Sequence, residues 1–81
     1  MQLDLDFTTG RLRSMADAVK QVISGYQTGH RFHGNQLHRD VSRIYPPAMA
    51  MYTDTVQRAM RRYCRINVRC INQNSSLYEK Q

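Results

Sequence analysis

Four arginines gather on and just after a helix that we predict from residue 53 onward. If Val56 faces inward, a helical step of about 100° per residue turns four charged side chains to the opposite face: Asp54, Arg58, Arg61 and Arg65. Thr55 and Arg62 then lie on one shoulder of the helix, and Gln57 lies on the other. Because a guanidinium stays charged and carries several donors, this face suits the binding of phosphate groups.

A polar segment follows this helix at residues 72 to 76, where the sequence is NQNSS. Its amides and hydroxyls can donate hydrogen bonds to phosphate, and Arg69 lies three residues before it. An exposed arginine face is often only a solvated surface. Here the basic helix and the polar segment are contiguous, so one polyanion can contact both, and this favours nucleic acid.

The neighbouring apolar residues predict the elements that hold these groups. A stripe at helical spacing is expected to face the core: Val56, Ala59, Met60 and Tyr63. Thr53 is the expected N-cap, because its hydroxyl can accept from a free amide of the first turn. From Ile66 the apolar residues alternate with a period of two, which predicts a strand, and Leu77 with Tyr78 begins the return strand. The two strands form a hairpin with the polar segment at its tip.

Two more elements are predicted in the first half of the chain. The first helix should extend from about residue 11 or 14 to residue 24, with Gly25 as its C-terminal cap. Residues 31 to 33 predict a brief strand in which Phe32 is buried.

A second helix should begin with Gly34 and Asn35 and end before Pro46, because the residue preceding a proline is disfavoured in helical conformation. Residues 46 to 51 form the connection to the basic helix. A single helical turn is expected there at residues 48 to 51.

Length and net charge limit the classes of protein to which this chain can belong. The 81 residues fit one small domain, and the formal net charge is +6. Residues 1 to 10 contribute only Asp4 and Asp6, so the other 71 residues carry +8, which suits a phosphate backbone. The sequence has no run of 18 apolar residues and no leader-like start, so we expect a cytoplasmic protein without a membrane partner.

The chain divides into an N-terminal arm at residues 1 to 13 and a domain at residues 14 to 81. Leu3, Leu5 and Phe7 alternate with polar residues, which predicts a strand or an extended arm. Three large apolar side chains favour packing against the domain or against a second copy. A homodimer is therefore one of the two interpretations of this arm.

Zinc binding and catalysis are not expected. The histidines and cysteines supply ligand types, but five residues separate Cys64 from Cys70, whereas structural zinc sites use tighter pairs. We treat both cysteines as reduced core residues and expect no metal and no cofactor. The acidic residues are scattered and no nucleophile motif is present, so no enzyme activity is expected.

Three short motifs support a more specific fold. They are F-x-G-x-x-L at Phe32, Gly34 and Leu37, D-T-V-x-R at residues 54 to 58, and S-x-Y at residues 76 to 78. With the order helix, strand, helix, turn, basic helix and hairpin, residues 14 to 79 resemble the winged helix-turn-helix superfamily of small bacterial and phage proteins. The resemblance implies a mainly α fold with a small β-hairpin (α+β), made of three helices and a two-stranded wing.

The same resemblance implies that the third helix enters the major groove and the wing contacts the flanking backbone. We therefore expect a double-stranded DNA-binding protein, sequence-specific or structure-tolerant, that serves as a transcriptional regulator or accessory factor. The residues expected near DNA are Tyr52, Thr53, Thr55, Gln57, Arg58, Arg61, Arg62, Arg65, Arg69, Asn72, Gln73 and Asn74.

Within this set, Arg58 and Arg61 are candidates for guanine and Gln57 for adenine. Arg65, Arg69, Asn72 and Asn74 would hold phosphate. A second interpretation stays open, because winged helices also bind proteins as adaptors or enzyme inhibitors, and a basic face suits an acidic protein partner.

Overall fold

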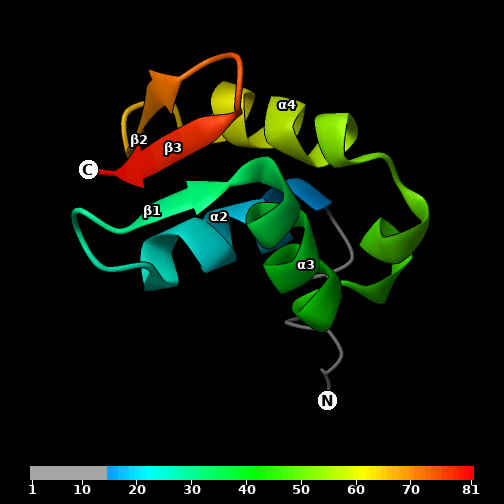
Figure 1. Cartoon of the computed structure of the whole chain (residues 1–81). Helices are drawn as coiled ribbons and strands as arrows, with labels where there is room; N and C mark the ends of the chain where they lie inside the picture. The colour runs from blue at the N-terminus through cyan, green and yellow to red at the C-terminus, as the bar shows by residue number, and fades with distance from the viewer. Residues whose placement is uncertain (1–14) are drawn as a thin grey trace.

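The structure is a computed structural model that describes residues 15 to 81. Its elements follow in the order α2 (Met15–Gly25), β1 (Arg31–His33), α3 (Gly34–Ile44), the 3-10 helix η1 (Pro46–Ala50), α4 (Thr53–Tyr63), β2 (Val68–Asn72) and β3 (Leu77–Lys80). Three α-helices and a three-stranded antiparallel sheet make this part of the chain a mixed α+β fold (Figure 1). No helix within residues 15 to 81 is both long and apolar enough to span a bilayer. The predicted N-terminal arm lies outside the described residues.

Helix α2 extends one residue beyond its predicted end and includes Gly25. Gly25, which we expected to follow the helix as its C-terminal cap, is instead the last residue of α2, and its φ is not positive. The chain continues to turn through Tyr26, whose amide donates to the Ile23 carbonyl at 3.1 Å. Gly29, with a φ of 89°, supplies the left-handed residue in the loop before β1, a conformation that costs glycine little.

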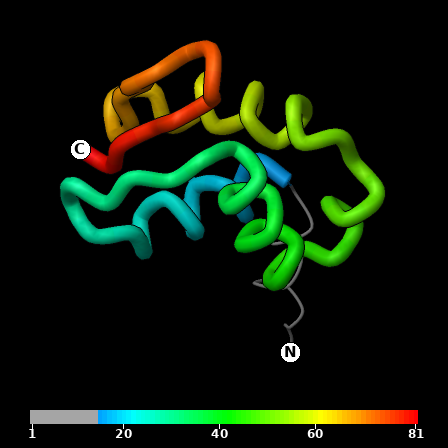
Figure 2. The backbone as a smooth tube through the Cα atoms, in the orientation of Figure 1, coloured from blue at the N-terminus to red at the C-terminus, as the bar shows by residue number. Residues whose placement is uncertain are grey.

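Strand β1 turns the predicted hairpin into a three-stranded sheet with the order β1-β3-β2. The brief strand at residues 31 to 33 and the burial of Phe32 are confirmed, but we did not predict that β1 would pair with the hairpin. Phe32 lies opposite Tyr78 and Arg31 opposite Glu79, so one face of the sheet is apolar and the other is charged. Figure 2 shows β1 and β3 side by side, which brings the start of α3 next to the C-terminal hairpin.

The connection between α3 and α4 begins with two prolines, as expected. Helix α3 ends at Ile44, and Pro46 starts η1, so the helical turn expected at residues 48 to 51 lies slightly earlier. Proline is well tolerated there because the first amides of a helix have no partner within it.

His38 of α3 holds this connection in place. Its Nε2 lies 2.6 Å from the Ala48 carbonyl oxygen, and its Nδ1 lies 2.9 Å from Oγ1 of Thr53. Since a carbonyl only accepts, Nε2 donates to Ala48, and Nδ1 shares a hydrogen bond with the Thr53 hydroxyl. One side chain thereby links α3, η1 and the start of α4.

Helix α4 has the predicted phase, with two corrections. Three residues of the predicted stripe are buried: Val56, Ala59 and Met60. Tyr63 is 47% exposed, and Cys64 takes the next buried position instead. Thr53 is not the N-cap, because Tyr52 occupies that position and the Thr53 hydroxyl is bonded to His38.

The core joins the three helices to β1 and β3. Its largest fully buried side chains are Phe32, Ile23, Leu37, Met60, Val19, Val41 and Val56. The ring of Phe32 lies between Tyr78 and Tyr26, with centroid distances of 5.8 Å and 4.9 Å. The Tyr26 hydroxyl donates to Asp40 at 2.6 Å. Burial, and then this carboxylate, raise the pKa of Tyr26, so the hydroxyl stays protonated well above neutral pH.

The two cysteines lie in different environments, and the expectation that Cys70 is a core residue was wrong. Cys64 is buried, and this burial raises the pKa of its thiol. Cys70 is exposed on the edge strand β2, where it lines an open recess between β2 and α4. Strand alternation places the Cys70 side chain on the apolar face of β2, but no element of the described chain covers that side chain.

A thiol reagent at mildly alkaline pH is therefore expected to modify the exposed Cys70 rapidly. Cys64 should react only after denaturation, because the thiolate is the reactive form and burial disfavours it. The absorbance of the released chromophore measures the two phases. A Cys70→Ser variant should lack the rapid phase. If the rapid phase persists in that variant, the assignment of the two thiols is wrong.

Candidate nucleic-acid interface

Four exposed arginines form a basic surface along α4 and the residues just after it. They are Arg58, Arg61, Arg62 and Arg65, and we call them the arginine face. Val56 anchors the opposite side of the helix in the core. Because like charges three or four residues apart repel, an anion bound to this surface would relieve that repulsion.

Asp54 partly neutralises the arginine face. Its carboxylate lies 3.0 Å from Nε of Arg58 and 4.0 Å from Nη2 of Arg61. The three side chains are about half exposed or more, so even the Asp54–Arg58 pair, one helical turn apart, contributes only about 0.3 to 0.5 kcal/mol. A phosphate group can replace this carboxylate at small cost.

The start of α4 presents two more groups to solvent. Tyr52 is 83% exposed, and Thr55 in the first turn is exposed as well. Thr53 is only partly exposed, and its hydroxyl is already bonded to His38. Tyr52 and Thr55 are therefore the available side chains at this end of the helix.

Gln57 does not face outward, where we expected it. It is 8% exposed, and its Oε1 accepts a hydrogen bond from the Tyr78 hydroxyl at 2.9 Å. The sequence did contain a signal for this, because Gln57, Met60 and Cys64 recur at spacings of three and four. Gln57 belongs to the edge of the buried stripe.

Tyr78 of β3 connects the sheet to the arginine face. Its hydroxyl donates to Gln57 and accepts from Nη1 of Arg61 at 3.1 Å. Arg61 is accordingly less exposed than Arg58, at 49% against 75% of the side chain. No pattern in the sequence indicates this network, in which a buried residue of β3 restricts the direction of the Arg61 side chain.

Replacing Tyr78 with phenylalanine is expected to lower the free energy of unfolding by about 1 kcal/mol, because the buried carboxamide of Gln57 loses its partner. Urea unfolding measures the change. Tyr45→Phe is the control, since the Tyr45 hydroxyl has no hydrogen-bond partner among residues 15 to 81. Equal losses in both variants would contradict a stabilising role for the network.

The turn between β2 and β3 is held partly by its own side chains. Oδ1 of Asn72 accepts from the backbone amides of Asn74 and Ser75, at 3.0 and 3.4 Å. Ser76 follows with a φ of 53°, which is unusual for a residue other than glycine. The side-chain oxygen of Asn72 is therefore occupied, while Gln73 remains exposed and outward.

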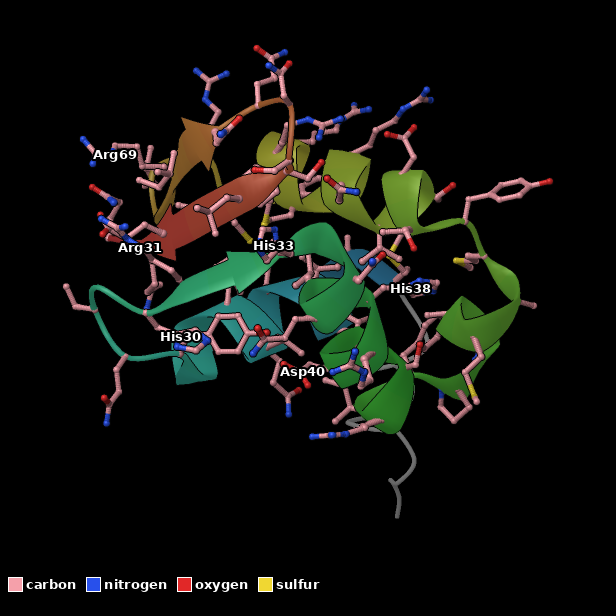
Figure 3. The ribbon with its side chains drawn as sticks, in the orientation of Figure 1. His30, Arg31, His33, His38, Asp40 and Arg69 are labelled. Carbon is pink, nitrogen blue, oxygen red and sulfur yellow. The ribbon has the colours of Figure 1, made fainter. Side chains whose placement is uncertain are left out.

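The same turn is docked on the start of α3. His33 donates from Nδ1 to the Ser75 carbonyl at 2.9 Å, and the Gly34 amide donates to the Ser76 carbonyl at 3.2 Å. Figure 3 shows His33 where β1 meets α3. Gly34 also lies against Gln57: a Cβ at this position would be 2.4 Å from Cδ of Gln57, so a larger residue does not fit without movement. These contacts fix the turn beside α4 (Figure 1).

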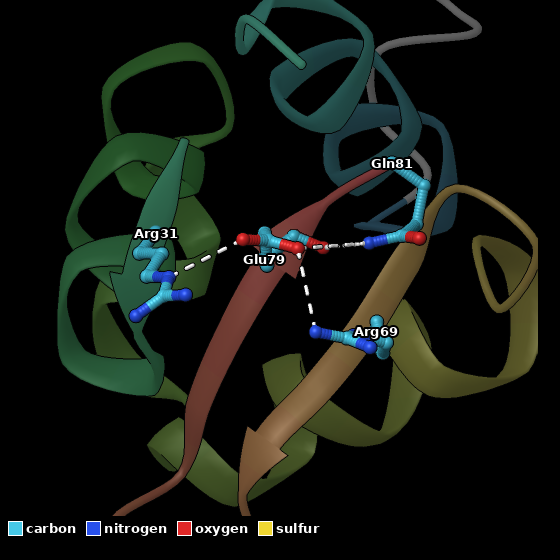
Figure 4. Close-up of polar contacts among 4 residues, drawn as sticks. All are labelled: Arg31, Arg69, Glu79 and Gln81. Atoms are coloured by element: carbon cyan, nitrogen blue, oxygen red, sulfur yellow. Dashed lines mark hydrogen bonds and ion pairs between the residues drawn. The ribbon is translucent and has the colours of Figure 1, made fainter. Parts of the chain in front are cut away.

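Arg69 does not join the arginine face. It pairs with Glu79 at 3.8 Å on the outer face of the sheet, and Glu79 also binds Nε of Arg31 at 3.2 Å (Figure 4). Val68 and Cys70 on either side of it line the recess toward α4, so strand alternation turns Arg69 away from that helix. Its charge is also partly balanced by this cross-strand carboxylate.

The three histidines make local contacts. Beyond the bonds of His33 and His38, the ring of His30 lies 4.7 Å from that of Tyr26, centroid to centroid. Figure 3 shows the three rings at separate places. Within residues 15 to 81, no group of three or more His, Cys, Asp or Glu side chains could hold a metal ion.

The structure thus brings together part of the predicted site. The arginine face, Tyr52 and Thr55 belong to α4 and its flanks, and the β2–β3 turn lies beside that helix. Gln57 is buried, and Arg69 lies on the outer face of the sheet. No family model matches the chain, and no curated protein or solved structure matches it either.

Proposed function

We propose that this protein is a small winged-helix protein that binds double-stranded DNA. The observation that carries the proposal is that the arginine face lies on and just after α4, the helix beside which the polar β2–β3 turn packs. The order of elements and the sheet order β1-β3-β2 support the winged-helix assignment. In that arrangement α4 is the recognition helix and the hairpin is the wing.

The contacts give the residues different proposed roles. Arg58 and Arg61 are suited to guanine, because a guanidinium can bond both acceptors of its major-groove edge. The bond from Arg61 to Tyr78 lowers the entropy lost when Arg61 binds, since its direction is already restricted. Arg62 and Arg65 would hold phosphate groups, and Gln57 has no base contact because its side chain is buried.

At the start of α4, Tyr52 and Thr55 would contact the bases or the DNA backbone. In the β2–β3 turn, Gln73 and Asn74 would contact the flanking DNA backbone. The protein would act by occupying its site, as a transcriptional regulator or an accessory factor.

Fluorescence anisotropy with a labelled random-sequence duplex at several salt concentrations tests this function. If the arginine face neutralises about four phosphates, log K should fall with log salt with a slope of roughly −3 to −4. Absence of binding even at low salt would contradict the proposal. That result would instead favour a winged-helix module for an acidic protein partner.

A further inference from the structure

A polar recess of about 210 Å³ lies where the start of α3, the middle of α4 and the β2–β3 turn meet. Its lining residues are His33, Gly34, Asn35, Gln57, Asn74, Ser75 and Ser76. None of them is acidic, and all except Gly34 have a polar side chain. We call this site the α3 recess.

The start of α3 supplies backbone donors to the α3 recess. Helix α3 has 11 residues, its N-cap His33 makes no side-chain cap hydrogen bond, and its first turn contains no acidic residue. The Gly34 amide is used by Ser76, but the next amides, of Asn35 and Gln36, have no partner within the helix itself. Such amides, together with the helix dipole, attract an anion.

Gln57 provides a second and independent indication of a ligand. It is 8% exposed, and its Oε1 is bonded to Tyr78, but its Nε2 donates to no acceptor among residues 15 to 81. A Cβ built on Gly34 would lie 2.5 Å from this Nε2, so the unpaired donor lies against the first residue of α3. A buried donor without an acceptor is unfavourable, and an anion in the recess would satisfy it.

We propose that the α3 recess binds a phosphate group. The donors are Nε2 of Gln57 and the first free amides of α3, with the side chains of Asn35, Asn74 and Ser75 at the rim. Glycine at position 34 is part of the site, because a side chain there would displace Gln57.

The source of the phosphate rests on the proposed function. If the protein binds duplex DNA, the ligand is a backbone phosphodiester beside the recognition helix. The same chemistry would accept free phosphate or a phosphomonoester. The donors named for the recess are uncharged, so a backbone contact there adds affinity with little effect on the salt slope.

Titration with inorganic phosphate, followed by ¹H–¹⁵N NMR, tests the site directly. We expect saturable shifts at the backbone amides of Asn35 and Gln36 and at the side-chain NH₂ of Gln57. Shifts confined to the arginine face, or shifts that do not saturate, would overturn the proposal.

Asn35→Asp is the first variant, because a carboxylate in the first turn of α3 would compete with phosphate while favouring the helix. Phosphate affinity should fall at least about tenfold, with a melting temperature no lower than that of the parent. Gln21→Glu adds the same charge on the exposed side of α2, away from the α3 recess, and it should retain most of the affinity. Equal losses in these two variants would mean that only general charge matters, and the proposal would fail.

Gln57→Leu removes the buried donor without changing the charge, and it leaves both partners of the Arg61–Tyr78 hydrogen bond in place. Phosphate affinity should fall about tenfold, while the NMR spectrum of the variant should remain that of a folded domain. Unchanged affinity would exclude Gln57 from the site and overturn the proposal.

Duplex binding by the same variants separates this inference from the proposed function. If DNA binds the parent, and Asn35→Asp weakens it no more than Gln21→Glu on α2, the inference fails and the function stands. If phosphate binds in the α3 recess but no duplex binds, the site stands with free phosphate as its source, and the proposed function fails.

Discussion

Val56→Asp is expected to abolish cooperative folding. Val56 is fully buried between the helices, so the variant places an unpaired carboxylate in the core. This costs several kcal/mol, which is a large part of the 5 to 15 kcal/mol that typically stabilises a domain. Thermal unfolding followed by circular dichroism measures the loss.

Thr55→Asp is the matched control, because it adds the same charge one position earlier on the exposed side of α4. Its free energy of unfolding should change by no more than about 0.5 kcal/mol. A cooperative transition of Val56→Asp near the parent's melting temperature would show that the phase of α4 differs from the one described.

The double variant Arg58→Gln/Arg61→Gln is expected to lower duplex affinity by about 1 to 3 kcal/mol for each arginine that contacts a base. Its salt slope should also become shallower, since fewer phosphates are neutralised nearby. Glutamine keeps a high helix propensity, so α4 is expected to remain formed. Fluorescence anisotropy measures both quantities.

The control is Arg39→Gln/Arg43→Gln, which removes the same charge from the exposed side of another helix, α3. Each pair of arginines also contacts an aspartate on its own helix: Asp54 lies beside Arg58 and Arg61, and Asp40 lies beside Arg43. If the two double variants lose equal affinity, binding depends on net charge and not on the face that α4 presents.

Local patterns predicted the elements of this fold well. The period of the apolar residues correctly predicted α4 and its buried side, and the two prolines correctly predicted where α3 ends. The alternation after Ile66 predicted the hairpin, although β2 begins at Val68 and Ile66 is exposed. These features depend on neighbours in sequence, so the sequence alone contains them.

Long-range contacts were harder to predict. The pairing of β1 with β3, the bonds of Tyr78 to Gln57 and Arg61, and the docking of the β2–β3 turn on α3 all join distant segments. Cys70 has the right alternation for a core strand, but the helices do not cover it. A polar residue at the edge of an apolar stripe, such as Gln57, can face either way until its partner is known.

The most direct test of DNA binding through α4 and the β2–β3 turn is chemical-shift mapping with a short duplex. We expect the largest changes at the arginine face, at Tyr52 and Thr55, and at the β2–β3 turn, with α2 little affected. Changes centred on α2 or on the outer face of the sheet around Arg69, or no changes at low salt, would contradict this expectation.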